Sequence, residues 1–354
     1  MMERPNIGIL LSPDCFLWTE HGLLTPKELN PGDNLLGLDS KSNLVKFPLS
    51  EKPVNCGDTQ VVSINTKCNE TILGADTSVF TNTGIIKAKD VEKGIVLEML
   101  TETKCNEIKK ICIPKENQTK ISGITINPDI ALCLAIARPH TSPRVVFSSI
   151  INKYPIPELN DILTKILPQL RREIGGRLFN KMTDGKSSWF FDHDKFYQVC
   201  QKINFQQGRL NWYKGWATQE STLEIPKFLR DNGLALMGNF FSGIIAFRCR
   251  VSQNTKFVSI QTPEKLHVVR AFIQNLAWIF GLNVYRKWIK SNGNYALEFK
   301  IDDFDGNIHR NADYAPVLHA IPEQSKAYCI QIPTNWTTWV DNVPVRANKI
   351  NYEN

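Results

Sequence analysis

Short apolar runs separated by turn residues fill the first third of the chain, from Cys15 to about Gln118. Runs such as TQVVSI, SVFT, GIVLEML and KKICI are rich in Val and Ile, and Gly, Pro, Asn and Asp interrupt them. Runs of this length between turn residues predict strands rather than helices. We therefore expect an all-β unit here, in which KKICI (109–113) is a strand.

After Pro128 the apolar spacing changes to that of helices, as in PELNDILTKILPQLRREI and EKLHVVRAFIQNLAWIFGL. Extended runs lie between the helices, as in RVVFSSI, GIIAFRCRV (243–251), KFVSIQT and YALEFKI. From Tyr314 short strands return. The pattern predicts a multidomain α+β protein whose middle consists of two similar helix-led halves, at about 128–205 and 221–305.

Composition narrows the class of protein. Of the 354 residues, 42% are hydrophobic and 22% charged, which permits a sizeable core and excludes collagen, coiled-coil rods and wholesale disorder. No apolar run approaches the roughly 18 residues of a membrane helix, and the start does not read as a secretory signal. The nine Cys are scattered without any CxxC pair, which argues against a disulfide framework or a zinc site. We expect an intracellular protein with reduced thiols, neither secreted nor membrane-bound.

Positive charge is concentrated in the middle of the chain. Residues 128–312 hold 25 Lys and Arg against 15 Asp and Glu, a net charge of +10, whereas the rest holds 17 against 20. A basic module between mildly acidic ends is typical of an insert that faces a polyanion. Ordinary surface solubility explains the same charge equally well.

Two phrases of the opening third, HGLLTPKELNPGDNLLGLD and NTGIIKAKDVEKGIVLEML, share one order of Gly turn, strand, polar turn and strand. The pair resembles the pseudo-twofold β fold of the Hedgehog and intein family, the HINT domain, and AYCIQIPTNWTTWVDNVPVRAN resembles its closing block. The middle resembles the LAGLIDADG homing endonuclease domain that many inteins carry as an insert. Its marks are DIALCLAIARPHT, LEIPKFLRDNGLALMGNFFSGI and VSIQTPEKLHVVRAFIQNLAWIFGLNV. The resemblance implies a HINT domain at 1–126 plus 313–354 and a two-copy endonuclease-like α/β domain at 127–312.

Most residues that the HINT family needs for splicing are replaced. The resemblance places the first-residue nucleophile near Leu10, the block His at Thr77, and the closing His-Asn pair at Ala347 and Asn348. Splicing needs a Cys or Ser nucleophile and an imidazole at the first two positions. Only the Asn is retained, and a Lys follows it in place of a nucleophile. Cys15 could supply a thiol, although a buried or turn Cys without chemistry is the simpler interpretation.

The endonuclease motif is altered in the same way. In the family, two helices pack through small residues, and an acidic residue at the foot of each binds divalent metal ions. The resemblance places Ala135 and Gly238 at the packing positions, and His140 and Gly243 at the acid positions. Both carboxylates are therefore missing. Asp129, at a helix start, is expected to act as an N-terminal cap.

Basic residues near aromatic ones are candidates for nucleic-acid contact, because cations meet phosphates and rings stack on bases. Core aromatics beside solvated charges are the alternative interpretation. The candidates are Arg171, Arg172, Arg177, Trp212, Lys214, Trp216, Arg248, Arg250, Lys256, Arg286 and Lys287.

No metal site and no cofactor are predicted. Asp192, His193 and Asp194 are adjacent, but successive side chains of an extended segment point apart. IDDFDGNIH (301–309) lacks the spacing and the closing Glu of a calcium loop. His267, inside an apolar helix, is interpreted as a packing residue.

These observations favour a catalytically inactive protein of intein and endonuclease origin that binds nucleic acid, DNA rather than RNA, through its basic insert. A structural or interaction subunit of a larger assembly, such as a ribonucleoprotein or transcription complex, is an alternative. A working intein-type homing endonuclease is a second alternative, but the sequence does not offer its nucleophiles and acids at the expected positions.

Overall fold

The computed structural model describes residues 7–66, 68–112, 120–121, 123–148, 150–151, 154–155, 157–183, 186–202, 233–248, 250–252, 257–263, 267–282, 284–289, 294–300, 313–333 and 336–349. The chain forms two compact units. We call Met1–Ile113, Glu264–Ile289 and Leu297–Asn354 the β unit, and Pro114–Pro263 with Lys290–Ala296 the α/β unit. The multidomain α+β class is confirmed, while the residue boundaries predicted for the two domains stay a prediction.

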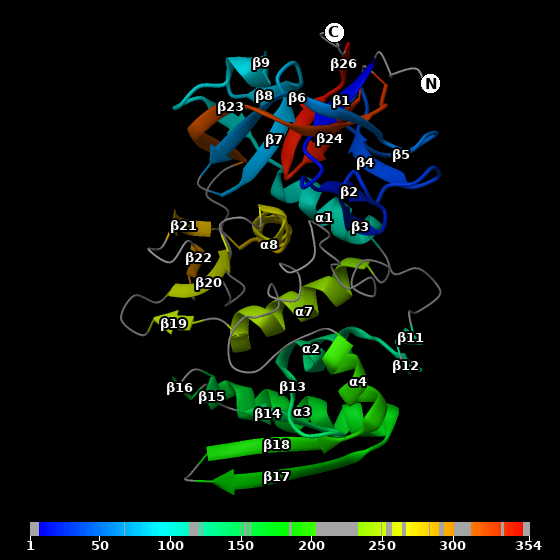
Figure 1. The fold of residues 1–354 in the computed structure, drawn as a ribbon, viewed down its shortest axis with the longest axis vertical. Coiled ribbons are helices and arrows are strands. Elements are labelled where there is room, and N and C mark those ends of the chain that lie inside the picture. The colour runs from blue at the N-terminus through cyan, green and yellow to red at the C-terminus, as the bar shows by residue number, and fades with distance from the viewer. Residues whose placement is uncertain are drawn as a thin grey trace. The chain divides into compact units, whose positions relative to one another are not determined.

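Most of the regular elements that the structure describes in the β unit are strands (Figure 1). Their order along the chain places ten strands and the short 3-10 helix η1 (Ala88–Asp90) in the first third and four more strands at the end of the described residues. The strands are β1 (Ile7–Leu11), β2 (Leu17–Thr19), β3 (Gly22–Leu24), β4 (Asn34–Leu38), β5 (Leu44–Pro48), β6 (Val54–Thr66), β7 (Glu70–Gly74), β8 (Ser78–Thr81), β9 (Gly84–Lys87), β10 (Val96–Glu98), β23 (Tyr314–Ile330), β24 (Thr337–Val340), β25 (Val343–Arg346) and β26 (Asn348–Lys349).

Within the described part of the chain, these strands form one 14-stranded sheet in the order β26-β1-β7-β6-β23-β10-β8-β25-β24-β2-β4-β5, with β3 beside β2 and β9 beside β8. The longest pair joins β6 and β23. β24 and β25 form a hairpin whose two turn residues, Asp341 and Asn342, have φ of 50° and 65°. Asp and Asn tolerate this left-handed region, and a two-residue turn of this kind matches the twist of the strands.

Helix α1 (Glu102–Ile111) interrupts the strands of the opening third. It begins after Thr101, whose hydroxyl accepts a hydrogen bond from the Lys104 amide at 3.3 Å. It buries Cys105 and Ile108 along one side. The prediction of a strand at KKICI is therefore wrong, because this cap and the helical spacing of the buried residues favour a helix.

Helix α8 (His267–Ile279) is buried at every residue from Arg270 onward, whereas a surface helix has a polar face. The Trp278 indole donates a hydrogen bond to the Leu100 carbonyl at 2.7 Å. The Arg270 guanidinium lies 3.5 Å from the Glu70 carboxylate. These polar contacts hold α8 in the core of the β unit. Strands β21 (Val284–Ile289) and β22 (Asn294–Lys300) follow α8 in the chain.

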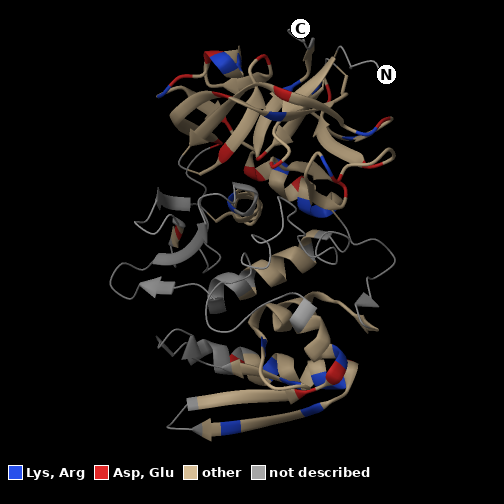
Figure 2. Cartoon of the chain, in the orientation of Figure 1, with Lys and Arg blue, Asp and Glu red and all other residues tan. Residues whose placement is uncertain are grey.

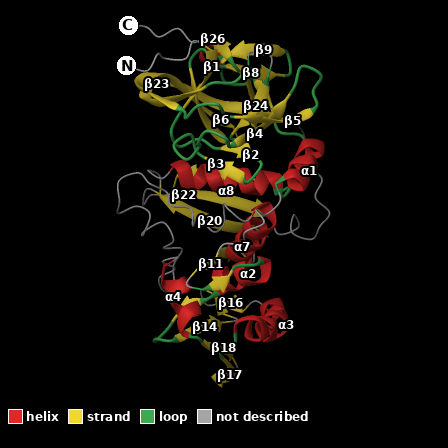
Figure 3. Cartoon of the chain, turned by 90° about the vertical axis from the view of Figure 1, so that its right-hand side faces the viewer, coloured by secondary structure: helices red, strands yellow, loops and turns green. Residues whose placement is uncertain are grey.

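The α/β unit combines helices with short sheets (Figure 3). Its elements are β11 (Lys120–Ile121), β12 (Ile124–Thr125), α2 (Pro128–Ile136), β13 (Arg138–Pro139), β14 (Arg144–Ser148), β15 (Ile150–Ile151), β16 (Tyr154–Pro155), α3 (Pro157–Ile174), β17 (Arg177–Thr183), β18 (Lys186–Asp192), α4 (Asp194–Lys202), α7 (Gly233–Arg248), β19 (Arg250–Ser252) and β20 (Phe257–Pro263). None of the helices that the structure describes is long and apolar enough to cross a membrane.

Helix α7 corrects the prediction of a strand at 243–251. The segment GIIAFR continues α7 as far as Arg248, and only Arg250–Ser252 forms a strand. The preceding LALMGNFF contains no turn signal other than one Gly, so the apolar run is long enough for a helix that is hydrophobic all round. In the first part of α7 the side chains of Leu234, Leu236, Met237, Phe240 and Phe241 are buried, as this pattern requires.

Candidate functional site

The positions that the resemblance assigns to splicing meet at one place in the β unit. The Thr77 hydroxyl, between β7 and β8, donates a hydrogen bond to the Leu10 carbonyl of β1 at 3.1 Å. The Asn348 side-chain amide donates to the Asp76 carbonyl at 2.7 Å and to the Ser78 hydroxyl at 2.6 Å, on either side of Thr77. Its strand, β26, also pairs with β1. The fold therefore brings Leu10, Thr77 and Asn348 together, and adds Asp76 and Ser78, which were not predicted.

The side chains at this place are engaged in ion pairs and apolar packing. Asp76 is paired with Lys87 and Lys89, each at 3.0 Å, and the hydrogen bonds from these two residues lower the pKa of its carboxyl. The Leu10 side chain fills the space beside Gly74, where a Cβ would lie 2.5 Å from that of Leu10. Apolar packing thus stands where the resemblance implies a nucleophile.

Two further residues adjoin these positions. Ala347, at the place implied for the penultimate His, is buried and carries no polar group. Cys329 lies directly opposite Leu10 on β23 and is also buried. Cys329 was not predicted as a neighbour of Leu10, because only the long-range pairing of β1 with β23 brings the two together.

A buried polar cluster surrounds Cys15, which is fully withdrawn from solvent. Its thiol donates to the Ile72 carbonyl at 3.3 Å. Burial raises the pKa of Cys15 well above its ordinary value, and the neighbouring Asp341 carboxyl adds to the effect. Asp341 accepts hydrogen bonds from the Phe16 amide at 2.9 Å and the Asn275 side chain at 3.0 Å. A thiol held in its neutral form is a poor nucleophile, so this environment favours a structural role for Cys15.

In the α/β unit, helices α2 and α7 pack against each other. Gly243 lies at their contact: a Cβ built on it would be 2.7 Å from the Ala135 Cβ and 2.9 Å from Leu132 Cδ1. Ala135 therefore stands at a close approach of the helices. Gly243 stands there too, although the sequence placed it at the second acid position and Gly238 at the contact. Gly238 lies five residues earlier on α7 and is buried.

The two ends of α2 carry the cap and the first acid position. The cap is Asn127, whose side-chain oxygen accepts from the Ile130 amide at 2.8 Å. Asp129 lies in the first turn instead, which corrects the prediction that it caps the helix. At the other end His140 is exposed just beyond β13, with its ring edge-on to Phe190 at 6.3 Å between centroids.

One face of the sheet β13-β14-β18-β17 packs on α4, where Phe147 and Phe191 are buried against the Phe196 ring. Residues directly opposite each other on paired strands share a face, and neighbours along a strand alternate. The opposite face collects cations and rings, and Figure 2 shows Lys and Arg on β17. We call its two central rows the basic-aromatic face: Arg138, Val146, Phe190 and Phe179 in one row, and His140, Arg144, Asp192 and Arg177 in the next.

Ion pairing and ring contacts organise the basic-aromatic face. Arg144 donates to both oxygens of Asp192, at 2.6 and 2.9 Å, and these bonds lower the pKa of Asp192. Phe179 and Phe190 stack with centroids 5.3 Å apart. The guanidinium groups of Arg144 and Arg177 lie 5.0 and 5.6 Å from the Phe179 centroid, within the range of cation–π attraction. The single carboxylate of the two rows is thus neutralised, which leaves the face positively charged.

No family model matches the chain, and no curated protein matches it. The similar solved structures include homing endonucleases and inteins.

A mesophilic variant of the homing endonuclease I-DmoI is 11% identical to the chain. The match covers 51% of this chain and 95% of that protein, with a TM-score of 0.31. A DnaX mini intein from Spirulina platensis is 17% identical, covering 25% of this chain and 66% of that one with a TM-score of 0.23. A DnaB intein from Synechocystis sp. PCC 6803 is 12% identical, covering 27% and 72% with a TM-score of 0.25. These are the two families that the sequence resembles.

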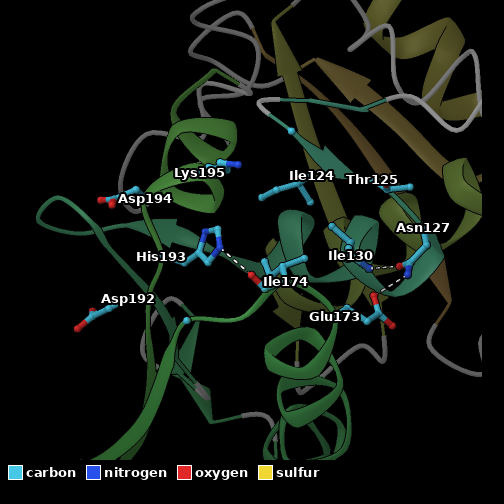
Figure 4. Close-up of a pocket in the computed structure, with 12 residues that line it drawn as sticks. Ile124, Thr125, Asn127, Ile130, Glu173, Ile174, Asp192, His193, Asp194 and Lys195 are labelled. Atoms are coloured by element: carbon cyan, nitrogen blue, oxygen red, sulfur yellow. Dashed lines mark hydrogen bonds between the residues drawn. The ribbon is translucent and has the colours of Figure 1, made fainter.

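Asp192, His193 and Asp194 do not converge on a common point (Figure 4). The Nδ1 atom of His193 accepts from the Phe196 amide at 3.0 Å, so Nε2 carries the proton and donates to the Ile174 carbonyl at 2.9 Å. The three residues line an open pocket of about 820 Å³ that α2, α3 and α4 also border. Across the described ranges, no group of three or more His, Cys, Asp or Glu is arranged to hold a metal ion.

The remaining predicted nucleic-acid contacts fall into three groups. Arg171 and Arg172 are exposed in the last turn of α3. Others are placed on α7, β19 and β21: Arg248, Arg250, Arg286 and Lys287. The rest lie outside the described residues, as does the segment 301–309: Trp212, Lys214, Trp216 and Lys256.

Proposed function

We propose that the protein is a non-catalytic nucleic-acid-binding protein of intein and endonuclease origin, and that it binds through the basic-aromatic face. The observation that carries the proposal is the gathering of Arg138, Arg144 and Arg177 on one sheet face whose carboxylate, Asp192, is already paired. Clustered cations attract a polyanion, and guanidinium groups match phosphate geometry. A charge that merely kept the protein soluble would need no such clustering.

The helix contact supports the loss of the metal site. Ala135 and His140 are five residues apart, which is the spacing between packing and acid positions in the family that the sequence resembles. If Gly243 is the packing residue of the second copy, the same spacing moves the second acid position to Arg248. Both positions then carry a nitrogen-bearing side chain, an imidazole and a guanidinium cation, in place of the oxygen ligands that Mg²⁺ requires.

The test measures how tightly the full chain binds duplex DNA. Binding is monitored by the fluorescence anisotropy of labelled DNA at salt concentrations between about 50 and 200 mM. We expect affinity to fall steeply with salt, since each neutralised phosphate releases a counterion. Arg177→Gln should make the slope of log K against log salt shallower by about 1. It should weaken binding to all DNA sequences about equally. Lys165→Gln, which removes an exposed charge from α3, is the matched control and should change neither quantity.

The competing function is that of an interaction subunit with no nucleic acid. Undetectable duplex and RNA binding at low salt would favour it over our proposal. Equal losses of duplex affinity in Arg177→Gln and Lys165→Gln would show that binding depends on total positive charge and not on the basic-aromatic face. That result would remove the face from the proposal.

A further inference from the structure

Arg138 is a cation of the basic-aromatic face that is partly withdrawn from solvent and lacks a counter-charge among the described residues. It is half-buried on β13, opposite Val146. Desolvation lowers its pKa, and no carboxylate opposes that effect. In the part of the chain that the structure describes, Arg138 has no ion-pair partner. A guanidinium withdrawn from water without a counter-charge is costly, and an anion would relieve that cost.

His140 and Arg144 lie on the same face of the sheet as Arg138, in the neighbouring row. The His140 amide donates to the Arg144 carbonyl at 3.0 Å, so both residues continue the β13–β14 pairing. The His140 ring lies edge-on to Phe190 at 6.3 Å, and the Arg144 guanidinium lies 5.9 Å from the same ring centroid. Phe190 belongs to the row of Arg138, because both lie opposite Val146. Two nitrogen-bearing side chains, those of His140 and Arg144, therefore border the Phe190 ring, and Arg138 lies in the same row beyond Val146.

Asp192 is the acid of this cluster, and Arg144 binds both of its oxygens. Its charge is therefore matched by Arg144 and does not compensate Arg138. A divalent cation placed here would face like charges, whereas a tetrahedral oxyanion would meet N–H donors from a guanidinium and an imidazole.

We propose that Arg138 and His140 form a binding site for a single phosphate group, which they bind directly and without a metal ion. This proposal rests on the proposed function. The occupant is a backbone phosphodiester of the bound nucleic acid. The site stands at the first acid position, so the place where the resembled family binds metal would here bind the anion itself.

Two measurements on the full chain test the site separately from nucleic-acid binding in general. In the first, duplex affinity is measured over a salt series for the intact protein, Arg138→Gln and the control Lys165→Gln. We expect Arg138→Gln to bind about tenfold more weakly at low salt and to lose about 1 from the salt slope, with the control unchanged. His140→Gln, at an exposed position, gives the same direction of change should Arg138→Gln fold poorly.

In the second, inorganic phosphate is titrated into protein with ¹³C-labelled His, and the His140 ring resonance is assigned by its loss in His140→Gln. A saturable shift of this resonance, absent in Arg138→Gln, supports the site even where no duplex binds, and would then identify free phosphate as its occupant. If phosphate leaves His140 unmoved and Arg138→Gln keeps the full duplex affinity and salt slope, the site is refuted while the proposed function stands.

Discussion

Replacing Asp341 by Asn should stabilise the protein at neutral pH. Asp341 is fully buried in the β24–β25 turn, with Oδ1 bound to the Phe16 amide and the Asn275 side chain. An Asn side chain keeps that acceptor oxygen and tolerates the φ of 50°. The substitution therefore removes the ionisable group and little else.

The size of the effect follows from the raised pKa. Burial raises the pKa of Asp341 to about 7, whereas an unfolded chain titrates near the ordinary value of 3.8. Between these values the folded chain holds a proton that the unfolded chain has released, so stability falls as pH rises. Each pKa unit corresponds to about 1.4 kcal/mol, which gives a penalty of about 4 kcal/mol above pH 7. Asp341→Asn escapes this penalty.

Urea unfolding of the full chain at pH 5 and pH 8 measures the difference. The stability of Asp341→Asn relative to the intact protein should rise by about 3 kcal/mol between the two pH values. Asp58→Asn, which alters an exposed carboxyl of the same unit, should follow the intact protein at both. Parallel pH dependence of Asp341→Asn and the intact protein would refute the reasoning, because Asp341 would then ionise normally in the folded state.

Three further predictions concern the helix contact, the lost splicing and the lost DNA cleavage. Gly243→Val should destabilise the α/β unit by about 1–3 kcal/mol, because its side chain meets Ala135 and Leu132; a melting temperature equal to that of the intact protein would show that the contact is loose. No ligated or cleaved flanks should appear by mass spectrometry when the chain is expressed between two tags, since neither Leu10 nor Thr77 supplies the needed nucleophile or imidazole, and no magnesium-dependent cut should appear in plasmid DNA.

The register of the helix contact could not be read from the sequence. Two glycines five residues apart, Gly238 and Gly243, fit the same small-residue motif. A helix with one apolar stripe shows which side packs, but α7 is apolar all round and its pattern favours no side. The close approach of Gly243 to Ala135 became visible only in the structure. By contrast, the resemblance assigned Leu10, Thr77 and Asn348 to one reaction, and the structure joins them through the Thr77 hydrogen bond and the pairing of β1 with β26.

Polar contacts made across long stretches of chain were also beyond prediction. Asn275 and Asp341 are 66 positions apart, and Trp278 and Leu100 are 178 apart. Nothing local distinguishes Asn275 from an ordinary polar residue of a helix. The cap of α2 shows the same limit on a smaller scale: Asn127 and Asp129 are both good capping residues, and the point at which the backbone turns decides between them.

Helix α8 links the two parts of the sequence more tightly than a simple insertion would. Its residues fall within the segment predicted as the endonuclease-like insert, yet its packing belongs to the β unit. Removing the segment would take the Trp278 indole from the Leu100 carbonyl and the Asn275 amide from Asp341, and buried polar groups that lose a hydrogen bond destabilise the fold. The core of the β unit is thus complete only when residues 264–289 are present. Binding by the basic-aromatic face must therefore be measured on the full chain, where a negative result cannot be blamed on a disrupted β unit.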